Sequence, residues 1–253
     1  MHKYMGDLHI HSTLSPCGSL EMSPTAIVNR AYELGLNLIA ITDHNAIENG
    51  YYASKIAKRF DINILYGLEA QTEEEIHTLV FFDTYEQAHE FYKVVYPKLP
   101  DISNIPEHFG DQVVVDENDE IIRAEKKLLL NSFTMSIDEF YSLVKDYGGL
   151  CIPAHVDRES YSIIAQLGFI PEHLDFKAVE ISYMATEEEI LERFPFLRKY
   201  TLVSFSDAHY LEDIGRVYTE FYLSSPSIKE IKKALKKEEG RYSRIVRKQG
   251  GYK

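Results

Sequence analysis

The chain has 253 residues, of which 45% are hydrophobic and 26% charged, and its formal net charge is −13. This is typical of one large globular domain, and the negative charge disfavours duplex nucleic acid while leaving room for a small phosphorylated substrate held through bound cations. No apolar run approaches the roughly 20 residues of a membrane-spanning helix, so we expect no membrane partner. The two cysteines give no disulfide framework, which suits the cytoplasm.

The first predicted element is a strand near the N-terminus. An extended backbone points successive side chains to opposite faces. Asp7, His9 and His11 would then share one face, and Leu8 and Ile10 the other. Two imidazoles and a carboxylate on one face predict a metal site, although chance histidines on a half-exposed strand would give the same pattern.

Short apolar runs alternate with helical spacings along the rest of the chain. The predicted strands cover residues 36–41, 62–68, 75–82, 150–152, 178–182, 201–205 and 217–223. The predicted helices cover residues 25–34, 46–59, 85–95, 136–147, 159–167, 187–194 and 227–237. Ser23 before Pro24, and Ser136 with Glu139, mark two helix starts. This alternation predicts an α/β protein with a parallel sheet, and seven or eight such units suggest a closed barrel.

Two segments depart from this rhythm. Residues 97–134 are interrupted by prolines and are predicted to form an insertion, with a hairpin made by residues 112–115 and 120–123. The barrel is expected to span residues 1–240, and residues 241–253 to form a basic, flexible tail.

Candidate ligands gather at or near the ends of the predicted strands. Active sites of parallel α/β barrels form at the C-terminal strand ends. Imidazoles and carboxylates crowded there would repel one another or be desolvated without cations between them, and these ligands suit Zn²⁺, Mn²⁺ or Fe²⁺. The candidates are His9, His11, His44, Glu69, His77, His155, Asp207 and His209.

Six short motifs, taken in order, resemble the polymerase and histidinol phosphatase (PHP) family. They are Asp-x-His-x-His-Ser from Asp7, Thr-Asp-His-Asn from Thr42, Gly-Leu-Glu from Gly67, the strand histidine His77, Pro-Ala-His from Pro153 and Ser-Asp-Ala-His from Ser206. The resemblance leaves out the insertion. It implies a distorted (β/α)7 TIM-like barrel with an inserted segment, a centre of two or three divalent metal ions, and phosphoester hydrolysis.

The resemblance also implies which residues share each metal. The first group would be His9, His11, Glu69 and Asp207. The second would be Glu69, His77 and His155, with Glu69 as the bridge. The third would be His44 and His209.

Three more residues are considered beside these ligands. Many relatives have a histidine or aspartate in the loop after the first motif, where this chain has Cys17. Its thiolate would be a ligand that favours zinc, unless Cys17 is an ordinary loop cysteine. Asp7 and Asp43 each precede a candidate ligand closely, and carboxylates in such positions often orient metal-bound imidazoles; for Asp43 a capping role is the alternative.

The favoured function is hydrolysis of a small phosphorylated metabolite. Two cations about 3.5–4 Å apart would generate a metal-bound hydroxide and clamp the phosphoryl oxygens. Arg158 would bind the phosphate bidentately, with Arg216 as a weaker candidate. His209 or His44, if free of metal, would protonate the leaving oxygen.

Two alternatives stay open. The same centre could act as a phosphodiesterase or 3′-phosphatase on nucleotides or short oligonucleotides, with Phe109 or Phe133 of the insertion stacking a base. The chain could also be a non-catalytic metal-binding module. The insertion is expected over the strand ends, where it would set specificity as a lid.

Overall fold

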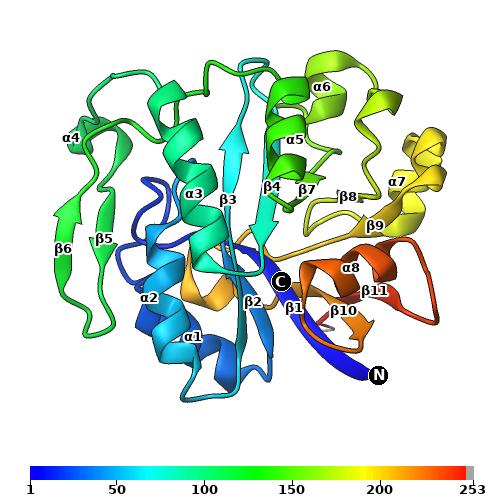
Figure 1. Ribbon diagram of the computed structural model, residues 1–253, viewed down its shortest axis with the longest axis horizontal. Coiled ribbons are helices and arrows are strands. Elements are labelled where there is room, and N and C mark those ends of the chain that lie inside the picture. Colours follow the sequence, from blue (N-terminus) through cyan, green and yellow to red (C-terminus); the bar gives the residue numbers. More distant parts are fainter. Residues whose placement is uncertain (249–253) are drawn as a thin grey trace.

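The computed structural model describes residues 1–248, and its main sheet curls around the centre of the molecule (Figure 1). Its strand order is β11-β10-β1-β2-β3-β4-β7. The strands are β1 (His2–Ile10), β2 (Leu38–Ile41), β3 (Asn63–Gln71), β4 (His77–Phe82), β7 (Leu150–Pro153), β10 (Val217–Leu223) and β11 (Tyr242–Arg247). β1, β2 and β3 run parallel, whereas the other neighbours in this sheet pair antiparallel.

A second, two-stranded sheet continues the curl. Its parallel strands are β8 (Ala178–Glu180) and β9 (Thr201–Val203). β8 contacts β7, and β9 contacts β11. Beyond β9 the chain returns to the first strand, where Ala208 forms a parallel bridge with Ile10. The two sheets together therefore surround one interior.

That interior is apolar. One buried cluster combines side chains from all eight strands β1–β4 and β7–β10, among them Leu8, Leu65 and Phe81. The α-helices are α1 (Pro24–Glu33), α2 (Glu48–Ala57), α3 (Tyr85–Val95), α4 (Pro106–Phe109), α5 (Ile137–Asp146), α6 (Ile163–Leu167), α7 (Glu187–Arg193) and α8 (Ile228–Leu235). Short 3₁₀ turns cover Tyr96–Lys98, Glu172–Leu174, Pro195–Lys199 and Leu211–Asp213.

The predicted helix starts are confirmed. The side chain of Ser23 accepts a hydrogen bond from the Ala26 amide, and a proline follows it at the first helical position. Ser136 and Glu139 form the reciprocal capping box. α6 begins later than predicted, because Ser162 caps it.

The α/β class is confirmed, but the count of seven βα units is not. Only residues 72–76 separate β3 from β4. A parallel neighbour needs a crossover of a dozen or more residues, so a connection this short forces an antiparallel pair. The strand ends therefore meet in one region, although strands and helices do not alternate regularly along the chain.

The insertion forms the predicted hairpin, β5 (Val113–Val115) and β6 (Ile121–Ala124), which lies beside α2 (Figure 1). The Val113 amide donates to the Thr13 carbonyl at 2.9 Å, and Asn45 Nδ2 donates to the Leu129 carbonyl at 2.8 Å. These bonds join the insertion to two loops of the barrel.

The C-terminal segment differs from the predicted flexible tail, because β11 pairs with β10. Its basic residues find acidic partners: Arg241 Nε donates to Glu230 Oε2 at 2.9 Å, and Arg244 Nε to Glu220 Oε2 at 2.6 Å. Tyr242 stacks on Tyr222. The prediction for residues 249–253 lies outside the described residues. Among residues 1–248, no helix has the length and apolar character needed to cross a membrane.

Glu230→Gln is expected to weaken this attachment in a pH-dependent way. Hydrogen bonds from Arg241 and the Ser224 amide lower the pKa of Glu230 to about 2. The folded protein thus keeps this carboxylate charged, and the resulting stability is full above the usual pKa of 4.5 and is lost as the pH falls through about 2. Urea midpoints of the wild type and the variant should differ most near neutral pH and converge near pH 2. A difference that does not change with pH would contradict this.

Candidate metal centre

The predicted ligands meet at one end of the curled sheets. β1 and the residue after it provide His9 and His11, and β3 and β4 provide Glu69 and His77. The loops after β2, β7 and β9 provide the others: His44, His155, Asp207 and His209. The backbone φ angles of His155 and Asp207 are 27° and 49°, a strained region for such residues that often marks functional sites.

Two histidines and two carboxylates form the first group. His9 Nε2 lies 3.2 Å from His11 Nε2, 3.5 Å from Glu69 Oε1 and 3.4 Å from Asp207 Oδ1. His11 Nε2 lies 3.4 Å from Glu69 Oε2 and 3.3 Å from Asp207 Oδ1. Ligand atoms placed about 2.1 Å from a tetrahedral zinc ion lie about 3.4 Å apart. The spacing of His9, His11 and Glu69 therefore fits one divalent cation, and Asp207 lies beside both histidines.

Glu69 also contacts three further imidazoles. Its Oε1 lies 2.9 Å from His77 Nδ1 and 3.0 Å from His155 Nε2, and its Oε2 lies 3.0 Å from His44 Nδ1. The expected second group is thus brought together, and His44 joins it.

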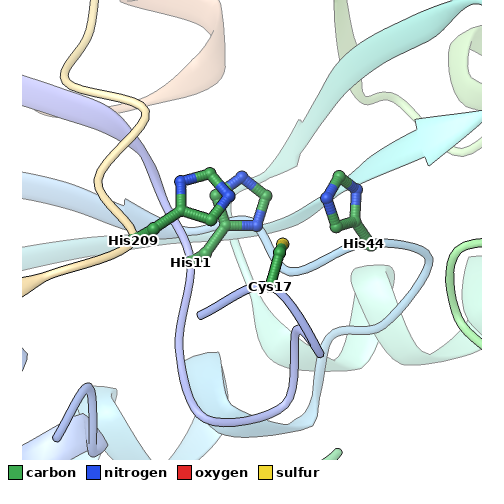
Figure 2. Close-up of side chains that lie close together, drawn as sticks. All are labelled: His11, Cys17, His44 and His209. Carbon is green, nitrogen blue, oxygen red and sulfur yellow. The ribbon is translucent and has the colours of Figure 1, made fainter. Parts of the chain in front are cut away.

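Cys17 belongs to a third group. Its Sγ lies within 4.8 Å of nitrogen atoms of His11, His44 and His209. Figure 2 shows the sulfur directed toward these rings, although the residue as a whole is exposed. The loop needs glycine at position 18, where a Cβ would lie 2.6 Å from the Ser12 carbonyl oxygen. One sulfur and three nitrogens form a donor set typical of zinc.

The electrostatic field keeps the two carboxylates charged. Burial alone would raise the pKa of Glu69 and Asp207, but the imidazoles around them, with Arg158 beside Asp207, hold each pKa well below its usual value. Burial lowers the pKa of His11 well below its usual value and that of His77 to about 4. Burial thus favours the neutral form of these two rings, which is the form that binds metal.

Glu180, the last residue of β8, is a site residue that the sequence patterns did not reveal. Its two oxygens lie 3.0 and 3.1 Å from His9 Nδ1, and Oε2 accepts a hydrogen bond from the His155 amide at 3.0 Å. A carboxylate on Nδ1 fixes the ring so that Nε2 faces the other candidate ligands, where it would bind a metal. The sequence feature that could have indicated Glu180 is its position at the end of an apolar strand.

We expect Glu180→Gln to lower metal affinity and kcat/KM for phosphoester hydrolysis about tenfold. The neutral amide would interact more weakly with the His9 ring than the charged carboxylate does. Metal titration and steady-state kinetics would measure both. The exposed Glu188 provides a matched control through Glu188→Gln. Unchanged metal affinity in Glu180→Gln would contradict the orienting role.

The prediction for Asp7 is wrong. Its carboxylate accepts the amides of Ser206 and Gly215, each at 2.9 Å, and so holds the loop before Asp207 rather than a histidine. The β1–β2 register shifts between Asp7 and Ile10, and such irregularities break strict alternation. Leu8 consequently packs in the interior and Ile10 against the α1 side.

Asp43 acts through a serine instead of contacting a histidine ring. It accepts hydrogen bonds from the Ser12 amide and from Ser15 Oγ, both at 2.7 Å. Ser15 Oγ in turn lies 3.0 Å from His11 Nδ1. Asp43 therefore positions both the Cys17 loop and the His11 ring.

The two candidate arginines have different surroundings. Arg158 Nη2 donates to the Asp207 carboxylate, and the side chain remains 35% exposed at the centre. Arg216 donates to the Ser206 carbonyl at 2.8 Å, the Asp207 carbonyl at 3.2 Å and the Asp213 carboxylate at 2.9 Å. Arg216 thus stabilises the loop that contains Ser206 and Asp207, and its guanidinium is not free to bind phosphate.

A cavity of about 280 Å³ opens over the centre. The insertion contributes Leu130 to its lining, from the segment that follows the hairpin, while the hairpin residues themselves do not line it. Phe133 is fully buried beside Phe140 and cannot stack a base, and Phe109 does not line the cavity. The lining residues are Cys17, His44, Glu69, Gln71, His77, Leu130, His155, Arg158, Tyr161, Asp207 and His209.

Known proteins are similar to this chain in sequence and in fold. The PHP domain family model matches residues 7–238. The uncharacterized protein YqxK of Bacillus subtilis is 26% identical over 274 residues, which cover 95% of this chain and 64% of that protein. The 5′-3′ exoribonuclease of Haemophilus influenzae is 44% identical over 69 residues, or 27% of this chain and 24% of that protein.

A solved structure with a similar fold is the lesion-specific endonuclease PfuEndoQ of Pyrococcus furiosus. Its TM-score is 0.72 at 21% identity, covering 96% of this chain and 58% of that one. The chain thus spans less than two thirds of the length of these relatives.

The expectation that duplex nucleic acid is excluded needs correction. A structure of Endonuclease Q with a 27-mer duplex also has a TM-score of 0.72, at 20% identity over 95% of this chain and 58% of that one. A protein of this fold therefore binds duplex DNA, and a net charge of −13 does not decide the question, because local fields govern such contacts. The match over residues 7–238 shows that the chain belongs to the PHP domain family, whose members include metal-dependent phosphoesterases.

Proposed function

We propose that the centre binds two or three divalent ions, Zn²⁺, Mn²⁺ or Fe²⁺, and hydrolyses the ester of a small phosphorylated molecule. The observation that carries this proposal is that His9 and His11 lie 3.2–3.5 Å from each other and from the carboxylates of Glu69 and Asp207. Buried charges and imidazoles this close need a cation between them.

The proposed ligand sets follow the three groups. The first metal would be held by His9, His11, Glu69 and Asp207. The second would be held by Glu69, His77 and His155, with His44 within reach. The third would be held by Cys17, His44 and His209, with His11 beside them. When bound, such ions activate water and polarise phosphoryl oxygens.

Residues of the chain would complete the reaction. Arg158 would bind a phosphoryl oxygen, because Asp207 holds its guanidinium at the cavity while part of it stays exposed. Burial opposes protonation of His209, but the neighbouring Cys17 and Asp207 raise its pKa. With two metals bound, His209 or His44 would donate a proton to the leaving oxygen; with three, both would be ligands.

The cavity volume favours a small substrate. Its 280 Å³ lies just below the usual range of about 300–1,000 Å³ for small-molecule sites. The second candidate is a phosphodiester or 3′-phosphate of a nucleotide or short oligonucleotide, which the similarity to the Haemophilus influenzae exoribonuclease supports. The free thiols of Cys17 and Cys151 suit a cytoplasmic location.

The test is hydrolysis of p-nitrophenyl phosphate and bis-p-nitrophenyl phosphate by metal-loaded protein, with bound metals counted by elemental analysis. We expect chelation to abolish hydrolysis and added metal to restore it. Activity that survives in the double variant His9→Ala and His155→Ala would place the chemistry elsewhere. Comparing a nucleoside 3′,5′-bisphosphate with histidinol phosphate would separate the two substrate classes.

A further inference from the structure

Tyr161 stands at the mouth of the metal cavity and has no part in the hydrolysis described above. Its ring stacks on that of His77, with centroids 4.8 Å apart and planes inclined by 22°. Its carbonyl oxygen accepts a hydrogen bond from the His77 amide at 2.8 Å. The residue is 43% exposed and lines the cavity. An aromatic ring is therefore held on a metal-site imidazole with part of its surface open.

The backbone of Tyr161 has a conformation that is unfavourable for tyrosine. The φ angle of Tyr161 is 57°, a left-handed conformation that is unfavourable for a bulky side chain and persists only where its surroundings impose it. The bond to His77 imposes it on one side. On the other, Ser162 Oγ donates to the Arg158 carbonyl at 2.7 Å and closes the turn. The turn thus presents Arg158 and Tyr161 to the same cavity.

The neighbouring groups suit a flat, uncharged partner. Leu130 adds an apolar surface. The side-chain amide of Gln71 is already used: Nε2 donates to Ser132 Oγ at 2.9 Å, and Oε1 lies 3.0 Å from His77 Nε2. The Tyr161 side of the cavity therefore offers a stacking surface with little capacity to read hydrogen-bonding edges.

We propose that Tyr161 stacks the base of a nucleotide whose phosphate lies at Arg158 and the metal centre. This inference rests on the proposed function and narrows its substrate class to a nucleotide, free or at the end of a strand. Stacking on an aromatic side chain accepts every base, because each has a π-face. The small cavity holds one nucleotide rather than several, and the site discriminates weakly among bases.

A binding measurement tests the stacking surface without turnover. The phosphonate analogues of adenosine 5′-monophosphate and ribose 5-phosphate, with a methylene in place of the ester oxygen, differ only in the base and cannot be hydrolysed. Calorimetric titration of zinc-loaded protein should show about tenfold tighter binding of the adenosine compound.

Variants test whether the difference in affinity between the two analogues comes from the Tyr161 ring. Tyr161→Leu should remove the tenfold ratio and Tyr161→Phe should keep it, with zinc content measured in each. Tyr32→Leu is the matched control, because Tyr32 is 57% exposed and lies on α1 outside the cavity.

The outcomes separate this inference from the proposed function. Equal affinities for the two analogues in the wild type, or a ratio that survives in Tyr161→Leu, would overturn the stacking role even if phosphoesters are hydrolysed. A ratio lost in Tyr161→Leu and kept in Tyr161→Phe would support it even if no ester were hydrolysed, which would instead count against the proposed function.

Discussion

Glu69→Gln is expected to lower kcat/KM for phosphoester hydrolysis by at least about 1,000-fold, well beyond the tenfold to hundredfold typical of residues that only orient ligands. The reason is that the Glu69 carboxylate contacts most of the histidines of the centre. Its oxygens lie within 3.5 Å of five imidazoles: His9, His11, His44, His77 and His155. An amide keeps the shape of the side chain but removes the charge that those rings and the metals share.

The variant should also lose more than one bound ion, because Glu69 belongs to two ligand groups. Elemental analysis would count the metals, and steady-state kinetics would measure the rate. Glu73→Gln is the control, since Glu73 is exposed and lies outside the cavity lining. A Glu69→Gln protein with full metal content and a rate within tenfold of the wild type would refute the shared role.

The convergence of the ligands could be predicted because it depends on strand ends. Parallel strands bring their C-terminal ends to one edge, so His9, His44 and Glu69 had to meet once β1, β2 and β3 paired. Asp207 joins them, because its loop returns to β1 through the Ala208 bridge.

Contacts that depend on local irregularity could not be predicted. Strict alternation would place Asp7 beside His9, but the register shift in β1 turned it toward Ser206 and Gly215. Glu180 gave a weaker signal, because a lone carboxylate at a strand end is common. Its role depends on β8 lying across the interior from β1, which no spacing in the sequence specifies.

The C-terminal segment shows the limit of reasoning from composition. A basic stretch with glycines resembles a solvated tail, yet Arg241 and Arg244 pair with Glu230 and Glu220. Those carboxylates lie on α8 and β10, so their availability emerges only from the fold. The net charge likewise does not decide whether the chain binds duplex nucleic acid, since it averages over surfaces with different local fields.

Cys17→Ser is expected to remove one metal ion per chain and to lower activity about 100-fold, because a hydroxyl replaces a soft, charged ligand. Burial of the sulfur would raise the pKa of Cys17, but His44 and His209 beside it lower the pKa to about 6. The thiolate is therefore present at neutral pH, and the thiolate is the form that binds metal. By contrast, burial raises the pKa of Cys151 to about 12.

Cobalt provides a readout of the bond itself. Cobalt-loaded wild-type protein should show the near-ultraviolet charge-transfer absorption of a thiolate bound to Co²⁺, and Cys17→Ser should lack it. Cys151→Ser is the control: this sulfur lies 3.0 Å from Thr78 Oγ1 in the core, away from the centre, so the absorption should persist. If the wild type lacks the absorption while binding three cobalt ions, the third ion is held by imidazoles alone. Cys17 is then an ordinary loop residue, and the preference for zinc that its sulfur implies is lost with it.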